Sequence, residues 1–481
     1  MRFNTVLVAL SQLVISLAPL MVMPFLTRTI EADGLGIYSL SFSVAAVCLA
    51  FGQMGSQLYG RREIAATSNR SERTRVFWEL ASLVFRATLL VSLIYVGVSF
   101  FIVDRSSILF SALLIQLLYL LSGALDVSWL LHGVERFRIV AGAIVLSRIV
   151  NVAWIFLAIR DPEDALLYVL IMATTFLIAS LLPWLVVYKF VDRPAFSSLF
   201  SLKHLRPLRH FVVPAVALQL FGAVNITIIG FYMTSAEVGY YDLAFRLARS
   251  PITLITVVGV VLLPKVTALF VSGDTESIGV YLHRGMNVTL ILASLIGFGF
   301  IGTANTFVTI FAGEKFESSV ILLQILALSL LTIAWGNVLR TQIILPQGLD
   351  RLYSYSLLIG LLVSIITSFL LLRPLGMVGA AIGFVFGELV VCVIQTIFIK
   401  ELLDLKDLSL LAIRIVLCGI ISCLGMLLVS EIEIGLYLTF SLQVLIGTLV
   451  FFILVSVSEL MTKDYFILNE LSRVKRNRFS R

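Results

Sequence analysis

Fourteen mostly apolar stretches run through the chain and constrain its fold more than any other feature. We predict membrane-spanning helices at 5–27, 37–58, 77–102, 108–131, 139–159, 165–188, 208–231, 242–270, 286–312, 319–345, 353–372, 376–399, 410–430 and 435–460. A stretch of about 20 apolar residues is long enough to cross a bilayer as a helix. Of the 481 residues, 60% are hydrophobic and 13% are charged. Because soluble domains usually carry about 25% charged residues, the sequence predicts an all-α polytopic membrane protein without a sizeable soluble domain.

Positively charged residues gather in the loops on one side of these predicted helices. With the N-terminus placed in the cytoplasm, the inward segments 59–76, 132–138, 189–207 and 461–481 are rich in arginine and lysine. The outward loops are acidic or carry little charge. Because lysine and arginine in short loops mark the cytoplasmic side, we predict that both termini are cytoplasmic. The net charge of +7 then reflects membrane topology, and no nucleic acid partner is predicted.

The cysteines and histidines form no pattern typical of a metal site. The four cysteines fall in apolar segments, and the four histidines lie in or beside polar loops without ligand spacing. We therefore predict no metal and no cofactor. The first apolar stretch is longer than the core of a signal peptide, and Pro19 and Pro24 interrupt it, so we expect the chain to retain it as a helix.

A short motif recurs at the outer ends of the second and eighth predicted helices. Gly36-Ile-Tyr-Ser-Leu-Ser-Phe42 and Gly239-Tyr-Tyr-Asp-Leu-Ala-Phe245 share four of seven residues. Six helices separate the copies, which indicates two parallel halves, although short apolar matches also arise by chance. We accordingly predict an N-terminal six-helix bundle at 1–200, a C-terminal six-helix bundle at 201–402, two additional helices at 403–460 and a basic cytoplasmic tail at 461–481.

Seven ionisable residues lie deep inside the predicted membrane helices, and five of them are arginines. They are Arg86, Asp126, Arg148, Arg246, Arg249, Arg340 and Glu388. A charge near the bilayer centre costs from about 2.5 to more than about 10 kcal/mol, so it usually faces a protein interior or a watery cavity. An interior with an excess of arginine favours a transport path for a large anionic substrate.

Six short segments between residues 1 and 400 match a known family in their order and spacing. They are Asn4 through Pro24-Phe-Leu-Thr-Arg28, Gly34-Leu-Gly-Ile-Tyr38, Gly60-Arg-Arg-Glu-Ile64, Gly230-Phe-Tyr-Met with Glu237-Val-Gly-Tyr-Tyr241, Gln347-Gly-Leu-Asp-Arg351, and Gly376-Met-Val-Gly-Ala-Ala381 with Glu388. The chain thereby resembles the polysaccharide flippases of the multidrug/oligosaccharidyl-lipid/polysaccharide exporter superfamily, the O-antigen type of lipid-linked oligosaccharide translocase.

The resemblance implies two six-helix bundles around a central cavity, with two peripheral C-terminal helices. It implies a transporter, and not an enzyme, in the bacterial inner membrane. The implied substrate is a polyprenyl-diphosphate-linked oligosaccharide, flipped to the outer leaflet by alternating access for O-antigen, capsule or exopolysaccharide assembly. Membrane lipids and other membrane proteins of polysaccharide assembly are the further expected partners. Family members often carry an acidic residue in the seventh helix, where this chain has Asn225.

Five arginines are the candidate substrate-binding residues. Arg86, Arg148, Arg246 and Arg249 lie within predicted spans, and Arg28 ends the first helix at the outer face. A guanidinium group binds phosphate through two parallel hydrogen bonds and keeps its proton, which suits a diphosphate in a partly dehydrated pocket. The alternative is structural: each buried arginine ties helices together, and Arg28 extends to the lipid headgroups.

The two intramembrane carboxylates also allow two interpretations. Asp126 and Glu388 are candidates for a proton or sodium coupling site, or for structural ion pairs with arginines. Near the cytoplasmic face, Arg340 is expected to extend toward the headgroups. Arg61 and Arg62 face the side where a lipid-linked donor would be loaded, although topology determination is the favoured explanation for both.

Two other functions remain open on sequence grounds. An ion-coupled multidrug or cation antiporter of the same superfamily would need an acidic pocket, whereas this interior is rich in arginine. A membrane polysaccharide polymerase or ligase would need a large outer loop with polar catalytic residues, whereas every predicted outer loop is short. The sequence therefore favours the flippase.

Overall fold

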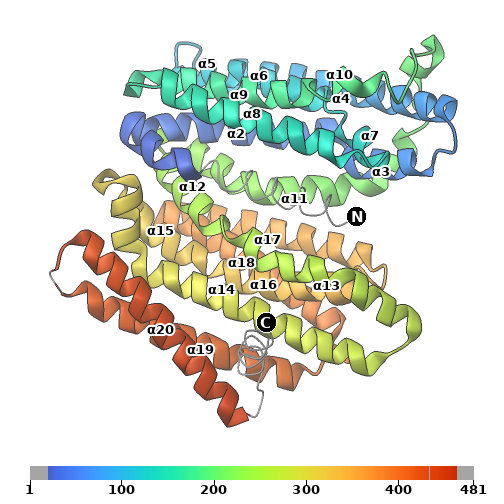
Figure 1. Ribbon diagram of the computed structural model, residues 1–481. Helices are drawn as coiled ribbons and strands as arrows, with labels where there is room; N and C mark the ends of the chain where they lie inside the picture. Colours follow the sequence, from blue (N-terminus) through green and yellow to red (C-terminus); the bar gives the residue numbers. More distant parts are fainter. Residues whose placement is uncertain (1–19, 433, 463–481) are drawn as a thin grey trace, which may run out of the picture. The chain divides into compact units, whose positions relative to one another are not determined.

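The computed structural model describes residues 20–432 and 434–462, and all regular elements in these ranges are helical (Figure 1). Within these ranges, thirteen helical segments are long and apolar enough to cross a membrane. They match the predicted spans from 37–58 to 435–460 one to one, so the all-α polytopic prediction is confirmed. Of the first predicted span, 5–27, residues 20–27 are helical and the remainder lies outside the described residues.

The described chain divides into two compact units. Unit 1 contains residues up to Leu243 together with Ile365–Ala380. Unit 2 contains Ala244–Ser364 and the residues from Ala381 onward. The helices of unit 1 are α2 (Glu31–Gln53), α3 (Ser56–Ala66), α4 (Arg70–Ile102), α5 (Ile108–Ile115), α6 (Leu117–Ala124), α7 (Ser128–Gly133), α8 (Phe137–Ala158), α9 (Ala165–Leu181), α10 (Trp184–Val187) and α11 (Leu205–Tyr232). The boundaries proposed above for two six-helix bundles remain a prediction.

Unit 1 is organised around α2. This helix packs against α4, α6 and α11, and α9 packs against both α6 and α8 (Figure 1). Small residues along α2, among them Ala45 and Ala46, are almost fully buried and let neighbouring helices approach closely. At the end of the unit predicted to be cytoplasmic, Phe77 and Trp129 form an aromatic cluster with ring centroids 5.5 Å apart. This cluster supports the short helices α3 and α7.

Unit 2 is organised around α14, the longest helix. Its helices are α13 (Ile252–Ser272), α14 (Thr275–Ala312), α15 (Ser318–Ala327), α16 (Ser329–Leu339), α19 (Leu405–Ser430) and α20 (Leu436–Thr462). Three further helices, α12 (Ser235–Arg249), α17 (Asp350–Leu375) and α18 (Met377–Phe398), have residues in both units. The α14 helix packs against α13, α15, α16, α19 and α20. The two C-terminal helices, α19 and α20, therefore share their core with the rest of unit 2.

Several predicted spans are broken helices. The second span changes direction at Met54, and the fourth is divided at Gln116 and again between α6 and α7. In the tenth span α16 continues into a π-helical turn at Arg340–Ile344. Such interruptions leave backbone groups available and are frequent at functional sites. The hydropathy pattern located these spans and gave no sign of the breaks.

The two copies of the repeated motif pack against each other within unit 1. A β-carbon on Gly36 of α2 would collide with the carbonyl oxygen of Ser235, and one on Gly239 of α12 would collide with that of Ala32. Each glycine thus faces the carbonyl four residues before the other glycine, which is the reciprocity of a local two-fold axis. Glycines permit this close crossing because they lack a β-carbon. We call this contact the glycine crossing.

Candidate functional site

The break in the second span forms one wall of the candidate site. Met54 and Gly55, which separate α2 from α3, have φ angles of 50° and 74°. A β-carbon on Gly55 would collide with the backbone of Phe211 in α11. Glycine therefore permits both the left-handed backbone and the close approach of α11. The result is a corner against which the first turns of α11 lie.

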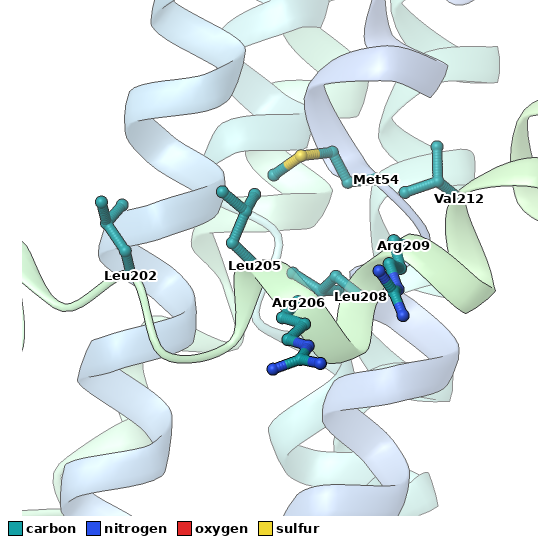
Figure 2. A pocket seen from close by; sticks show the side chains of 7 residues that line it. All are labelled: Met54, Leu202, Leu205, Arg206, Leu208, Arg209 and Val212. Carbon is teal, nitrogen blue, oxygen red and sulfur yellow. The ribbon is translucent and has the colours of Figure 1, made fainter.

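A cavity of about 450 Å³ lies beside these first turns (Figure 2). Its lining residues are Met54, Leu202, Leu205, Arg206, Leu208, Arg209 and Val212. Two are arginines, and the other five are apolar. We call this cavity the arginine pocket. Leu202, Leu205 and Arg206 belong to the segment 189–207 that the charge distribution predicts to be cytoplasmic, and the other lining residues lie at the adjoining ends of predicted spans.

The two arginines give the pocket its charge. Arg206 and Arg209 are three residues apart and exposed, so their side chains share one face of α11. Figure 2 shows both guanidinium groups on the side of the helix away from Leu205 and Val212. The guanidinium group of Arg62 lies nearby, 5.7 Å from the centre of the Phe211 ring. This arrangement can bind an anionic headgroup while apolar side chains contact an attached hydrocarbon.

His204, immediately before Leu205, joins two other buried polar side chains in a chain of hydrogen bonds. The Nδ1 atom of His204 lies 2.8 Å from the Tyr59 hydroxyl, and its Nε2 atom lies 3.0 Å from Oε2 of Glu79. None of the three residues is more than 9% exposed. They join α3, α4 and the start of α11. We call them the Tyr59–His204–Glu79 triad.

The predicted substrate ligand Arg86 lies in α4 and contacts the segment that leads to the pocket. Its Nε donates to the Ser82 carbonyl and its terminal nitrogen donates to the Ser201 carbonyl, both at 3.2 Å. The guanidinium group also lies 5.7 Å from the centre of the Phe200 ring. The structure thus places Arg86 next to Leu202 of the pocket lining, where it positions the chain.

Arg28 and Arg148 occupy other parts of unit 1. Arg28 is exposed and donates to the carbonyl oxygen of Pro24 at 2.6 Å. Arg148 is half-buried in α8, with its guanidinium group 5.3 Å from the centre of the Phe176 ring in α9. An arginine held over an aromatic face keeps its charge and its outer hydrogen-bond donors.

In unit 2 the structure brings together two of the predicted residues. The charge of Arg249 in α12 acts on the carboxylate of Glu388 in α18. The Arg249 guanidinium group also lies 5.2 and 5.8 Å from the ring centres of Phe245 and Phe384. Arg246 is half-buried one turn before Arg249. Whether Glu388 forms a structural pair or a coupling site remains a prediction.

Asp126 and Arg340 each have neutral partners. Asp126 lies in the break between α6 and α7 and accepts from the Gln57 amide at 2.8 Å and from the Ser128 backbone at 2.9 Å. Arg340 begins the π-helical turn and donates to Tyr353 at 3.1 Å and to Asn337 at 2.8 Å. These contacts hold broken helical segments in place.

The predicted site residues are therefore spread over both units. Arg28, Arg86, Arg148 and Asp126 belong to unit 1, whereas Arg246, Arg249, Arg340 and Glu388 belong to unit 2. Their role as substrate or coupling residues remains a prediction. Within residues 20–432 and 434–462, no group of three or more His, Cys, Asp or Glu side chains could hold a metal ion.

Sequence reasoning missed the pocket arginines and the buried triad. Arg206 falls in the inward segment 189–207, whose basic residues are explained by topology, and Arg209 falls at the start of the predicted span 208–231. The available signal was their spacing of three at the start of an apolar helix. Glu79 and His204 are 125 residues apart, so no local pattern links them. Asn225 of α11 accepts a hydrogen bond from Ser368 at 3.0 Å.

Two curated proteins with the same name are similar to this chain over most of its length. A protein of Shigella dysenteriae named "Putative O-antigen transporter" is 21% identical over 379 residues, covering 78% of this chain and 94% of that protein. A protein of the same name from Escherichia coli (strain K12) is 23% identical over 413 residues, covering 83% and 97%. Both alignments extend over nearly the whole relative.

Solved structures share the fold. The lipid II flippase MurJ in an inward closed conformation has a TM-score of 0.72 at 17% identity and covers 95% of this chain and 99% of its own. An inward-facing multidrug resistance MATE family transporter of the MOP superfamily has a TM-score of 0.56 at 14% identity, covering 82% and 98%. The model of the family described as "Polysaccharide biosynthesis protein" matches residues 2–270, more than half of the chain. With its fold and its relatives in agreement, this chain belongs to the polysaccharide biosynthesis protein family.

Proposed function

We propose that this protein flips a lipid-linked oligosaccharide from the cytoplasmic to the outer leaflet of the bacterial inner membrane. The observation that carries the proposal is the arginine pocket, in which Arg206 and Arg209 lie beside five apolar side chains. A polyprenyl diphosphate needs this combination of cationic and apolar contacts. Membership of the polysaccharide biosynthesis protein family and relatives named as O-antigen transporters support the same substrate class.

In this proposal the pocket receives the substrate at the cytoplasmic side. Each guanidinium group donates two parallel hydrogen bonds to a phosphate oxygen pair, and neither loses its proton at neutral pH. The apolar lining contacts the first isoprene units of the carrier lipid. Binding here compensates the diphosphate charge before it leaves the aqueous interface.

Crossing the membrane then requires further cations at depth. Arg148, Arg246 and Arg249 are half-buried within membrane helices and would compensate the headgroup charge along the path. Exchange between states open to opposite sides would move the headgroup without exposing it to lipid. Such a transporter makes and breaks no covalent bond in its substrate. Both termini would be cytoplasmic, and other membrane proteins of polysaccharide assembly would receive the product.

Complementation tests this function directly. Expression of the chain in a bacterial strain that lacks its own flippase is expected to restore surface polysaccharide and to clear the lipid-linked repeat units that accumulate in the inner leaflet. Surface polymer is measured by gel electrophoresis, and the lipid-linked intermediates are measured by mass spectrometry. The test is repeated in strains whose repeat units differ in chemistry. If the chain exports cationic dyes and restores polymer in none of these strains, it is a cation antiporter.

A second test concerns the charge at mid-membrane. Arg148→Gln is expected to lower polymer output about tenfold or more, because a lost charged hydrogen bond costs about 1.5–3 kcal/mol. Arg105→Gln is the matched control, since Arg105 also lies over a phenylalanine ring, at 5.2 Å from its centre, and is exposed outside the helices. If both variants support normal polymer at equal protein level, Arg148 has no part in transport.

A further inference from the structure

The chain segment between α10 and α11 follows α4 from its first turn toward the membrane. We call residues 188–204 the linker. Side chains of α4 at intervals of four residues form hydrogen bonds with it, namely Arg70, Thr74, Trp78, Ser82 and Arg86. Residues four apart lie on one side of a helix, so the linker runs along α4. The depth of each linker residue in the membrane therefore follows from the depth of the α4 residue that it contacts.

The exposed surface of α4 changes from polar to apolar along this contact. Its exposed residues before Phe85 are Arg70, Ser71 and Arg75, whereas every exposed residue from Phe85 to Ile102 is apolar. At about 1.5 Å per residue that apolar stretch is about 26 Å long, close to the thickness of about 30 Å of the hydrocarbon core of a bilayer. The boundary between headgroups and hydrocarbon therefore lies near Phe85.

The linker reaches this boundary at the short 3₁₀ helix η2 (Phe196–Phe200). Arg86, next to the boundary in α4, donates to the carbonyl oxygen of Ser201 at 3.2 Å, just after η2. Phe196 and Phe200 are 78% and 62% exposed, and their ring centroids lie 5.3 Å apart. The linker thus presents a pair of aromatic side chains at the level where the apolar surface of α4 begins. Exposed aromatic side chains at this level are typical of a segment that lies in the membrane interface.

The charges of the linker agree with a lipid surface. It contains Lys189, Arg193 and Lys203, all exposed, against one acidic residue, Asp192. Asp192 forms an ion pair with Arg70 at 2.9 Å. A leaflet that faces the cytoplasm carries anionic headgroups and attracts basic segments. A soluble partner protein could also cover two exposed phenylalanines, but their level beside the apolar surface of α4 favours lipid.

We propose that the linker is an interfacial anchor, in which Phe196 and Phe200 insert between the acyl chains of the phospholipid leaflet on the side predicted to be cytoplasmic. The hydrogen bonds with α4 already order the linker, so insertion costs little conformational entropy. The basic residues attract the linker to the leaflet, and burial of the two rings keeps it there.

The anchor also determines where the arginine pocket lies. Because Leu202 of the linker belongs to the pocket lining, insertion of the linker places the pocket at the surface of the leaflet. A lipid headgroup can then enter from the membrane and need not pass through bulk water. Use of this position for loading a lipid-linked substrate rests on the proposed function, whereas insertion of the linker does not.

Spin-label accessibility in the full-length protein tests this proposal. The four native cysteines are replaced by alanine, and a nitroxide is attached at Ala195→Cys, an exposed position next to Phe196. The protein is placed in nanodiscs of phosphatidylethanolamine and phosphatidylglycerol. Relaxation of the label is measured with oxygen, which concentrates in lipid, and with a nickel chelate, which stays in water.

Two exposed positions of α4 calibrate this measurement: Leu93→Cys as the lipid reference and Ser71→Cys as the aqueous reference. The oxygen-to-nickel ratio at residue 195 is expected to be severalfold above the aqueous reference and to approach the lipid reference. An aqueous ratio at this position would mean that the phenylalanines face water, where a protein partner could cover them.

Substitution of the two rings separates insertion from attraction by charge. Phe196→Ser with Phe200→Ser is expected to lower the ratio at residue 195 to the aqueous value, because the linker then lacks the side chains that insert. Phe196→Leu with Phe200→Leu keeps apolar side chains and should keep the label in lipid. Arg193→Gln with Lys203→Gln is the matched control: it removes two exposed charges and leaves both rings, so the ratio should stay near that of the parent protein.

The proposal is overturned if the parent protein gives the aqueous ratio, if the serine variant leaves the ratio unchanged, or if loss of the two charges alone releases the label. No substrate is present in these measurements, so they can be interpreted when complementation fails. An inserted linker in a protein that restores no polymer would keep the anchor and refute the proposed function. Restored polymer with the linker in water would refute the anchor and keep the function.

Discussion

Replacing Arg206 and Arg209 together with glutamine is expected to reduce surface polymer at least about a hundredfold in a flippase-deficient strain. Each arginine is expected to form charged hydrogen bonds with the diphosphate, and each such bond contributes about 1.5–3 kcal/mol. Since about 1.4 kcal/mol corresponds to a factor of ten in binding, two lost contacts have a large combined effect. The measurement is polymer per copy of membrane-inserted protein, with lipid-linked intermediates followed in parallel.

The control must separate pocket chemistry from membrane topology, because both arginines also add positive charge to an inward segment. Arg193→Gln with Lys203→Gln removes the same number of charges from the same connecting segment, and neither residue lines the pocket. This control is expected to keep polymer output near normal. Equal losses in the two double variants would mean that the charge of the segment, and not the pocket, matters. Arg206→Lys with Arg209→Lys should restore part of the output, since lysine keeps the charge without the bidentate geometry.

Gly36→Ala is expected to disrupt the glycine crossing. The added β-carbon would collide with the carbonyl oxygen of Ser235, which belongs to a helix backbone and cannot move alone. The helices α2 and α12 must therefore separate, and overpacking of this kind costs about 1–3 kcal/mol or more. Gly239→Ala should act in the same way, because its β-carbon would collide with the carbonyl of Ala32. Thermal unfolding in detergent, followed by size-exclusion chromatography, measures the loss.

Helix propensity is the main confounding effect, since alanine favours a helix relative to glycine by about 1 kcal/mol. Gly97→Ala and Gly142→Ala supply the control, because both glycines lie within membrane helices and have open space around an added β-carbon. These two variants should be as stable as the parent protein or more stable. If Gly36→Ala matches them, the crossing has more freedom than its geometry indicates.

The spans could be predicted because hydropathy is a local property of the chain. All thirteen spans that the structure describes coincide with predicted ones. The repeated motif was also visible in the sequence. Its reciprocal packing was not, since nothing in a seven-residue match states that Gly36 faces Ser235.

The candidate site was less accessible to prediction. Buried arginines attracted attention because charges are rare in membrane helices, yet Arg86 contacts a connecting segment whose course no hydropathy profile reveals. Arg206 is one of the basic residues that any inward loop carries, and Arg209 lies at the edge of a predicted span. Histidine patterns gave no signal for His204, because its partners Tyr59 and Glu79 come from helices far earlier in the chain.

The sequence by itself determined the membrane environment, the number and order of the described spans, and the family. These properties follow from the transfer of apolar side chains out of water and from motif order, which are read residue by residue. Only the tertiary structure decided which residues meet. Arg86 of α4 contacts the segment before α11, Gly55 forms the corner that admits α11, and His204 is enclosed beside Glu79. Contacts between distant segments depend on helix rotation and on breaks within helices, and hydropathy is insensitive to both.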